Sequence, residues 1–232
     1  MRHIDQSLKA ISRAHNNSAR SSRKFVTLGK RARISSTALR GPYLPPENWH
    51  EPRETPQGKF CVVMQPAGAG FRHVLTKDDV RERLARLPEW MVEPLQVVQF
   101  SQMTQKKRRS PCYGMQWGQT IYLYPIEESR IEVFHAPPKP AQRIEAAMYG
   151  ARWQAADAGR WHLVWTEDAI RDFYLNNVLI HELGHILDSR NTSHRDRERY
   201  AEWFALEMGY KASRRADLAE RAAAKYVVRR HG

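Results

Sequence analysis

The stretch NNVLIHELGHILDSRN, residues 176–191, sets two histidines and a glutamate, His181, Glu182 and His185, in an otherwise apolar run. Residues four apart share one face of a helix, so His181 and His185 would project side by side. That spacing suits two imidazole nitrogens binding one metal ion at roughly 2.0–2.1 Å. Glu182 lies about 100° round the helix from His181, where it would hold a metal-bound water. This HExxH pattern predicts a zinc (Zn2+) site. The alternative is a helix whose two histidines are hydrogen-bonded within the protein and bind no metal.

A catalytic zinc ion needs a third protein ligand and an open coordination position. Asp188 and Asn191 stand where HExxHxxGxxH would require glycine and histidine, so that pattern is absent. Glu198 and Glu202 lie four apart on the next predicted helix, and a short turn between antiparallel helices would bring their shared face to the histidines. One glutamate would bind the metal and the other would orient a histidine N–H. The spacing leaves both assignments open.

From Thr166 onward the chain has helical periodicity. Thr166 is the expected N-cap of the helix that carries the histidines, which should end near residues 189–191. Ser193 is the expected N-cap of the following helix, and Gly209 is the expected end of it. A last, alanine-rich helix is expected over residues 215–228.

The part of the chain before Thr166 consists mainly of predicted strands. We expect strands over residues 59–66, 93–100, 118–126, 130–138 and 160–165, the last of them buried. We also expect helices over residues 76–88, with Thr76 as the N-cap, and over residues 141–149. Strand 118–126 is either a sheet edge that pairs with an extended peptide or an ordinary buried strand. Because strands come first and helices last, the order predicts an α+β fold.

The chain divides by composition into a polar, basic segment, residues 1–58, and a domain, residues 59–232. Residues 1–40 hold ten lysines and arginines and a single acid, Asp5, and so supply +9 of the net charge of +13. We expect residues 1–58 to be largely disordered or extended. The segment 1–40 would attract nucleic acid, unless it is simply a solvated basic tail.

A second basic run consists of Lys106, Lys107, Arg108 and Arg109, which the strand pattern places at a loop tip. It is a further candidate for contact with nucleic acid, and a solvated loop is the alternative.

The two cysteines, Cys61 and Cys112, have no metal-binding spacing, and we expect both to be reduced thiols. No apolar run reaches the roughly 20 residues that span a bilayer, and no secretory h-region is evident. These features favour a cytoplasmic location. The Arg- and Ser-rich start also overlaps the composition of an organellar transit peptide.

The motif HELGHILD followed by AEWFA resembles the HExxH…E zinc metallopeptidases called gluzincins, over residues 179–208. The local match is closest to the anthrax-lethal-factor-like and MtfA-type peptidases. That resemblance implies a zincin-like domain, with a small mixed or antiparallel sheet followed by an active-site helix and C-terminal helices. It implies a protein or peptide substrate, the metal ligands His181, His185 and Glu202, and Glu182 as the base. A more distant resemblance to ImmA/IrrE-type peptidases aligns Glu198 with the ligand instead.

The spacer to the third ligand is shorter here than in the lethal-factor group, and a tyrosine carried there before the ligand has no counterpart. Tyr200, His194 or a residue outside the motif would then stabilise the oxyanion. Two other classes compete with a peptidase. One is a nucleic-acid-associated protein with a structural or regulatory zinc site, and the other is a metal-free interaction domain.

Overall fold

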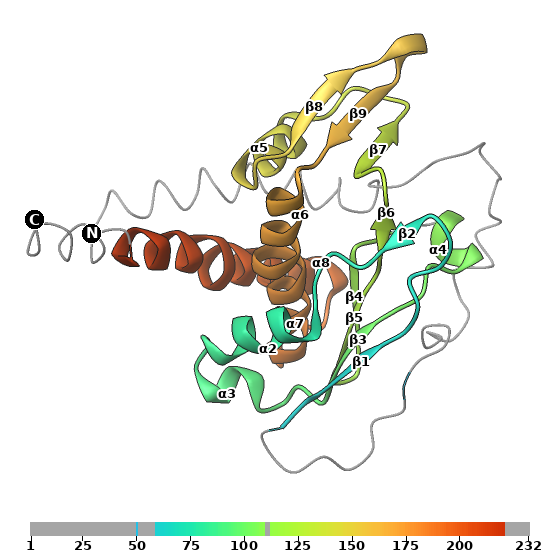
Figure 1. Cartoon of the computed structure of the whole chain (residues 1–232). Coiled ribbons are helices and arrows are strands. Elements are labelled where there is room, and N and C mark those ends of the chain that lie inside the picture. Colours follow the sequence, from blue (N-terminus) through green and yellow to red (C-terminus); the bar gives the residue numbers. More distant parts are fainter. Residues whose placement is uncertain (1–49, 51–58, 110–111, 221–232) are drawn as a thin grey trace, which may run out of the picture.

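The computed structural model describes His50 and residues 59–109 and 112–220 (Figure 1). The predictions for residues 1–58, His50 apart, and for the helix beyond residue 220 lie outside the described residues. The strands are β1 (Cys61–Met64), β2 (Phe71–Arg72), β3 (Val97–Phe100), β4 (Gly114–Trp117), β5 (Thr120–Leu123), β6 (Ile126–Glu127), β7 (Ile131–Phe134), β8 (Arg152–Ala155) and β9 (Trp161–Val164). The α-helices are α2 (Lys77–Ala85), α3 (Glu89–Val92), α4 (Gln105–Arg109), α5 (Pro140–Met148), α6 (Glu167–Phe173), α7 (Leu179–Leu187) and α8 (His194–Phe204). A 3-10 turn, η2 (Asp157–Gly159), and two π-helical turns, η3 (Tyr174–Val178) and η4 (Ala205–Lys211), complete the described elements.

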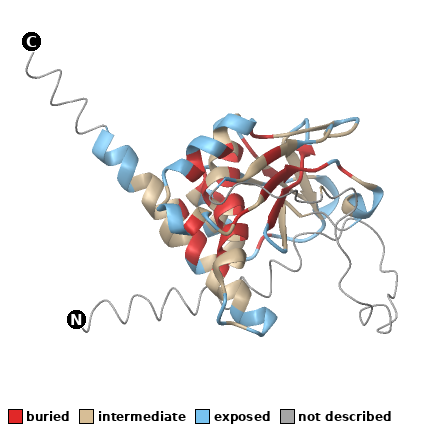
Figure 2. Cartoon of the chain, turned by 90° about the horizontal axis from the view of Figure 1, so that it is seen from below, coloured by how far each residue is buried: buried red, intermediate tan, exposed pale blue. Residues whose placement is uncertain are grey.

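The largest sheet is mixed and has the strand order β1-β3-β5-β4. β1, β3 and β5 run parallel, and β4 pairs antiparallel with β5 through a tight connection at Gly118, whose φ is +58°. Every residue of β3 and β5 is buried (Figure 2). One face of this sheet is covered by α7, which contacts β4 and β5, and by α2, which contacts β1 (Figure 1). The core of the molecule therefore lies between the sheet and the helix that carries the histidines.

Strand 118–126 was expected either at the edge of a sheet or in its interior, and the structure decides between the two. β5 pairs with β3 on one side and with β4 on the other, so it is an ordinary buried strand and the edge prediction is wrong. The two edge strands are β1 and β4, neither of which has a second partner strand among the described residues. Sequence reasoning had not assigned a strand to residues 114–117.

Two smaller antiparallel sheets accompany the mixed sheet: β2 with β6, and β7-β9-β8. The hairpin formed by β8 and β9 lies beside α5 and extends away from α2 and α7 (Figure 1). In β9, which was predicted to be buried, only Leu163 is fully so, because the other residues lie on an extension that is open to solvent. Glu132 of β7 accepts hydrogen bonds from Tyr113 Oη (2.6 Å) and Trp165 Nε1 (2.7 Å). The bond from Tyr113 ties the third sheet to the start of β4, and the bond from Trp165 joins β7 to the end of β9.

The helix caps predicted from the sequence are confirmed. The hydroxyl of Thr76 accepts from the backbone N–H of Asp79, that of Thr166 from Ala169, and that of Ser193 from Asp196. The helix that begins after Thr166 passes through η3 into α7 and ends at Leu187, two residues before the predicted range. The capping residues therefore predicted where the helices start, whereas the predicted helix end was two residues too late.

Gly209 does not end the helix that follows Ser193, contrary to prediction. The helix continues through η4 to residue 220, so residues 215–220 of the expected last helix belong to this same helix. A Cβ on Gly209 would lie 2.0 Å from the backbone oxygen of Asn176. The glycine is there because two helices approach each other closely, not because a helix stops.

The basic run is a short helix, α4, and not a loop tip. No hairpin forms here, because β3 pairs with β5 and not with the strand that follows it along the chain. Lys107 points inward: its Nζ lies 3.0 Å from Cys112 Sγ and 4.1 Å from the centre of the Tyr124 ring. Only Lys106, Arg108 and Arg109 are exposed.

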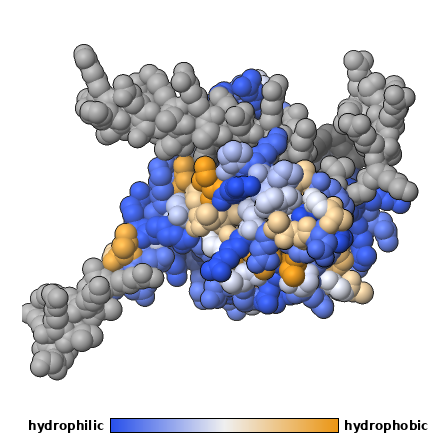
Figure 3. Space-filling view, turned by 90° about the horizontal axis from the view of Figure 1, so that it is seen from above, coloured by the Kyte–Doolittle hydropathy of each residue, from blue (hydrophilic) through white to orange (hydrophobic). Residues whose placement is uncertain are grey.

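The mixed α/β architecture, with small sheets and C-terminal helices, agrees with the predicted α+β class. The face in Figure 3 is mostly hydrophilic, with apolar side chains in small separate groups. Within the described part of the chain, no helix combines the length and the apolar character that crossing a bilayer requires.

Candidate metal centre

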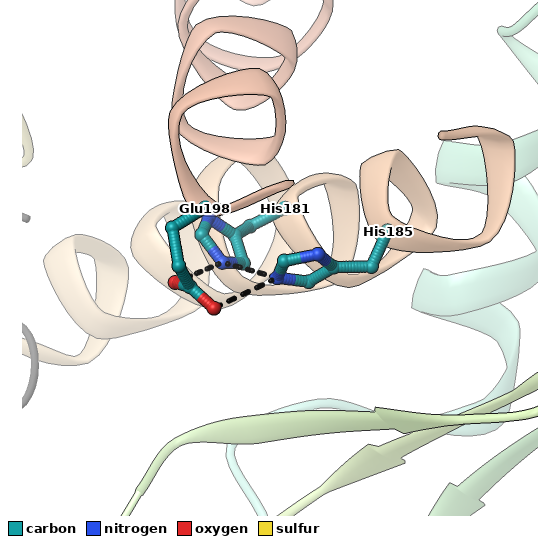
Figure 4. Close-up of side chains that lie close together, drawn as sticks. All are labelled: His181, His185 and Glu198. Atoms are coloured by element: carbon teal, nitrogen blue, oxygen red, sulfur yellow. Dashed lines mark hydrogen bonds and ion pairs between the residues drawn. The ribbon is translucent and has the colours of Figure 1, made fainter. Parts of the chain in front are cut away.

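Three side chains from two helices converge at one point: His181 and His185 of α7 and Glu198 of α8 (Figure 4). The Nε2 atoms of the two histidines lie 3.1 Å apart. The Glu198 carboxylate oxygens lie 3.8 Å from His181 Nε2 and 3.6 Å from His185 Nε2. A tetrahedral zinc ion bound at 2.0–2.1 Å would hold its ligand atoms roughly 3.3 Å apart. The donor set therefore fits zinc in both chemistry and spacing.

Close packing of α7 on α8 brings the glutamate to the histidines. A Cβ on Gly184 would lie 3.1 Å from the Cα of Ala201 and 3.2 Å from the Cβ of Phe204. Gly184, between the two histidines, and Ala201, three residues after Glu198, thus let the two helix backbones approach each other beside the convergent side chains. Arg197 adds a hydrogen bond to the backbone oxygen of His185 (3.2 Å).

Both imidazoles are in the protonation state that a metal ion requires. Burial and the neighbouring His185 lower the pKa of His181 to about 3. Burial, together with the charges of Arg197 and His194, lowers the pKa of His185 to about 4. Both rings are therefore neutral at physiological pH, and each has a nitrogen lone pair to donate.

Glu182 is buried between α7 and the edge strand β4. A Cβ on Gly114 would lie 2.9 Å from Glu182 Oε1, so only glycine lets the strand pass this close to the carboxylate. Burial and the charge of Glu198 raise the pKa of Glu182 to about 8, although Lys107 and the Gln116 backbone act in the opposite direction. A carboxylate with a pKa near the working pH is suited to accept and return a proton.

Glu202, the ligand implied by the closest resemblance, is not in the convergent group. Among the described residues, only His181, His185 and Glu198 place metal-ligating atoms within 4.8 Å of one another. Both carboxylate oxygens of Glu202 are buried and accept no hydrogen bond within the described chain. Burial, Glu145 and Glu198 raise the pKa of Glu202 to about 8. The geometry therefore favours the alternative that the sequence left open, Glu198.

The two candidates for the oxyanion stabiliser occupy different places. His194 is exposed, and its Nδ1 lies 3.3 Å from Glu198 Oε1, so it contacts the centre through the glutamate. The ring of Tyr200 stacks on Phe204 and lies against Trp203. Of the two, His194 is the one that adjoins the convergent group, through Glu198.

Sequence reasoning did not place Gly114 or Lys107 near Glu182; it named Lys107 only as part of the basic run. A signal for Gly114 existed, since GMQW and TIYL are separated by only Gly118 and Gln119, the spacing of a hairpin. That hairpin would have placed a strand before β5. No local signal marks Lys107, because its inward direction depends on how α4 packs.

Comparisons of the chain with protein-family models, with curated proteins and with solved structures gave no match.

Proposed function

We propose that this chain is a zinc-dependent peptidase with His181, His185 and Glu198 as metal ligands and Glu182 as the general base. The observation that carries the proposal is the convergence of the three ligand atoms within 4.8 Å, beside a buried glutamate of raised pKa. Structural zinc sites usually close their coordination with four protein ligands, whereas catalytic sites use three and keep one position open. Three convergent ligands favour the catalytic class.

Zinc, when bound, would supply a Lewis acid that lowers the pKa of a water molecule toward neutrality. Glu182 would accept the proton of that water and pass it to the leaving amine. The hydrogen bond from the Gln116 backbone and the absence of a side chain at Gly114 hold the Glu182 carboxylate under β4.

The edge strand β4 supports a peptide as the substrate class. It pairs with β5 on one side only within the described chain, and it borders Glu182 through Gly114. An extended peptide can add to such an edge by main-chain hydrogen bonds. A peptide paired there would run beside the base.

The zincin-like assignment of the domain, and the cytoplasmic location expected from the sequence, belong to this proposal and stay predictions. The test of the function has two parts. Purified protein should contain close to one zinc ion per chain, and His181→Ala should remove it. Glu182→Gln should keep the zinc and abolish cleavage of an unstructured protein such as casein. Hydrolysis at the wild-type rate by Glu182→Gln would rule out the mechanism.

A second candidate function is binding of nucleic acid, with a structural or regulatory zinc site. The exposed Lys106, Arg108 and Arg109 of α4 support it, together with the +9 charge of residues 1–40. Each phosphate contact that is lost should reduce the slope of log affinity against log salt by about 1. Gel shifts with duplex DNA test this for a chain lacking residues 1–40 and for a K106E/R108E/R109E variant. A wild-type chain that shifts no DNA at low salt would exclude this function.

A further inference from the structure

The two helices that carry the proposed ligands each contain a π-helical turn, and these turns face each other. η3 directly precedes α7, which holds both histidines, and η4 directly follows α8, which holds Glu198. The two turns pack together, with the backbone oxygen of Asn176 against Gly209. π-turns are rare and often accompany functional sites. One residue more or less in such a turn rotates everything beyond it by about 100°, so η3 decides which face of α7 the histidines occupy.

A single buried side chain joins the two turns. Arg83 of α2 is only 8% exposed. Its Nε donates to Asn176 Oδ1 in η3 (2.7 Å), and its Nη2 donates to the backbone oxygen of Met208 in η4 (2.7 Å). The planar guanidinium offers donors in a fixed geometry, so these two bonds hold two acceptors from different helices at a set separation.

The surroundings of Asn176 make it the centre of this junction. Its Nδ2 donates to Asp172 Oδ1 (2.7 Å), and its backbone oxygen accepts from Tyr149 Oη (3.3 Å). Asp172 is in turn paired with Arg214, beyond η4. The side chain and backbone of Asn176 are thus both held from several directions.

Burying a guanidinium is costly, and an apolar side chain of similar size would often pack α2 equally well. Burial lowers the pKa of Arg83 to about 10, so the group stays charged at neutral pH. A buried charge with hydrogen bonds to two helices is suited to fix the position of one helix along the other. An apolar contact would leave the two helices free to shift.

We propose that Arg83 is a positioning residue of the metal centre: by joining Asn176 to Met208, it fixes the register in which His181, His185 and Glu198 meet. This inference rests on the proposed zinc site. Arg83 touches none of the ligands, so its effect passes through the two π-turns.

The experiment compares Arg83→Met with Arg171→Met. Arg171 of α6 pairs with Asp79 of α2 (2.7 Å), so it also holds α2 against the histidine-bearing helix but does not reach either π-turn. Zinc affinity is measured by competition with a chromophoric chelator, the geometry of the site by the visible absorption of the Co²⁺-loaded protein, and the fold by thermal unfolding of the metal-free chain.

Arg83→Met should lower zinc affinity by about 10–100-fold, as loss of outer-shell support does in other metal sites, and should change the Co²⁺ spectrum. Arg171→Met should keep the wild-type affinity and spectrum, even where its melting temperature falls. The zinc affinity of Arg83→Lys should lie between those of Arg83→Met and wild type, because an ammonium group does not offer two donors in the fixed geometry of a guanidinium.

The proposal would be overturned if folded Arg83→Met bound zinc with wild-type affinity. It would also be overturned if Arg83→Met and Arg171→Met lost zinc affinity equally. If Arg83→Met fails to fold, the zinc affinity of Asn176→Ala is measured instead. That change removes one acceptor of Arg83 and leaves its hydrogen bond to Met208 in place. A wild-type zinc affinity of Asn176→Ala would overturn the proposal. A wild-type chain that binds no zinc would overturn the proposed function as well. Zinc binding that Arg83→Met leaves unaffected would overturn the positioning role alone.

Discussion

The carboxylate of Glu198 lies 3.6 Å from His185 Nε2, on the side where the two imidazoles face each other. Glu202, one turn further along the same helix, has both oxygens buried away from this group. Substitutions of Glu198 and Glu202 should therefore show which of the two glutamates is the third metal ligand.

Glu198→Ala should lose zinc, and Glu202→Gln should retain it. The first change removes one of three ligands, and the second removes a carboxylate that contacts no ligand atom. Zinc per chain, measured by atomic emission after gel filtration, distinguishes the two variants. The opposite pattern, with zinc lost only from Glu202→Gln, would show that Glu202 is the ligand.

The raised pKa of Glu202 predicts how stability depends on pH. A carboxyl group whose pKa is raised from 4.5 to about 8 binds its proton more tightly in the folded chain, so it destabilises the fold as the pH rises from about 4.5 through about 8. Glu202→Gln removes that contribution. The metal-free variant should therefore melt at least about 2–4 °C above wild type at pH 8.5, which corresponds to ~1 kcal/mol, and the difference should shrink toward pH 5.

Glu82→Gln is the matched control, because Glu82 is exposed on α2. It should leave the pH dependence of the melting temperature unchanged. A melting temperature of Glu202→Gln that follows wild type across the whole pH range would contradict the argument.

Gly209→Ala should destabilise the chain even though alanine favours a helix by about 1 kcal/mol over glycine. The new Cβ would stand 2.0 Å from a backbone oxygen, which cannot move aside as a side chain can. We expect a net loss of ~1–3 kcal/mol in the free energy of unfolding, measured by urea denaturation. Gly184→Ala, with nearest contacts of 3.1–3.3 Å, should cost less. A Gly209→Ala variant as stable as wild type would mean that the two π-turns are not in close contact.

Gly114→Ala should impair hydrolysis while zinc stays bound. Its Cβ would fall 2.9 Å from Glu182 Oε1 and 2.7 Å from Val178 Cγ1, so the base must shift but the histidines need not. The measurements are casein cleavage and zinc content on the same preparation. Full activity would show that the Glu182 position under β4 is not needed for proton transfer.

The sequence determined the local features of this protein. The HExxH spacing predicted two histidines on one helix face, and threonine and serine at residues 76, 166 and 193 marked helix starts that the structure confirms. These features depend on hydrogen bonds and side-chain directions within a few residues, which local sequence specifies. The α+β class followed from the order of such elements.

Tertiary structure alone decided how those elements meet. Glu198 and Glu202 share a helix face, so only the packing of α8 on α7 separates a ligand position from a buried acid. Gly209 resembled a helix end, yet it marks a contact between helices distant in sequence. The sequence of β5 fitted a sheet edge and a buried strand equally well, and its pairing with both β3 and β4 makes it a buried strand. Each of these outcomes depends on which distant backbone comes near, and the pattern of a single segment does not contain that information.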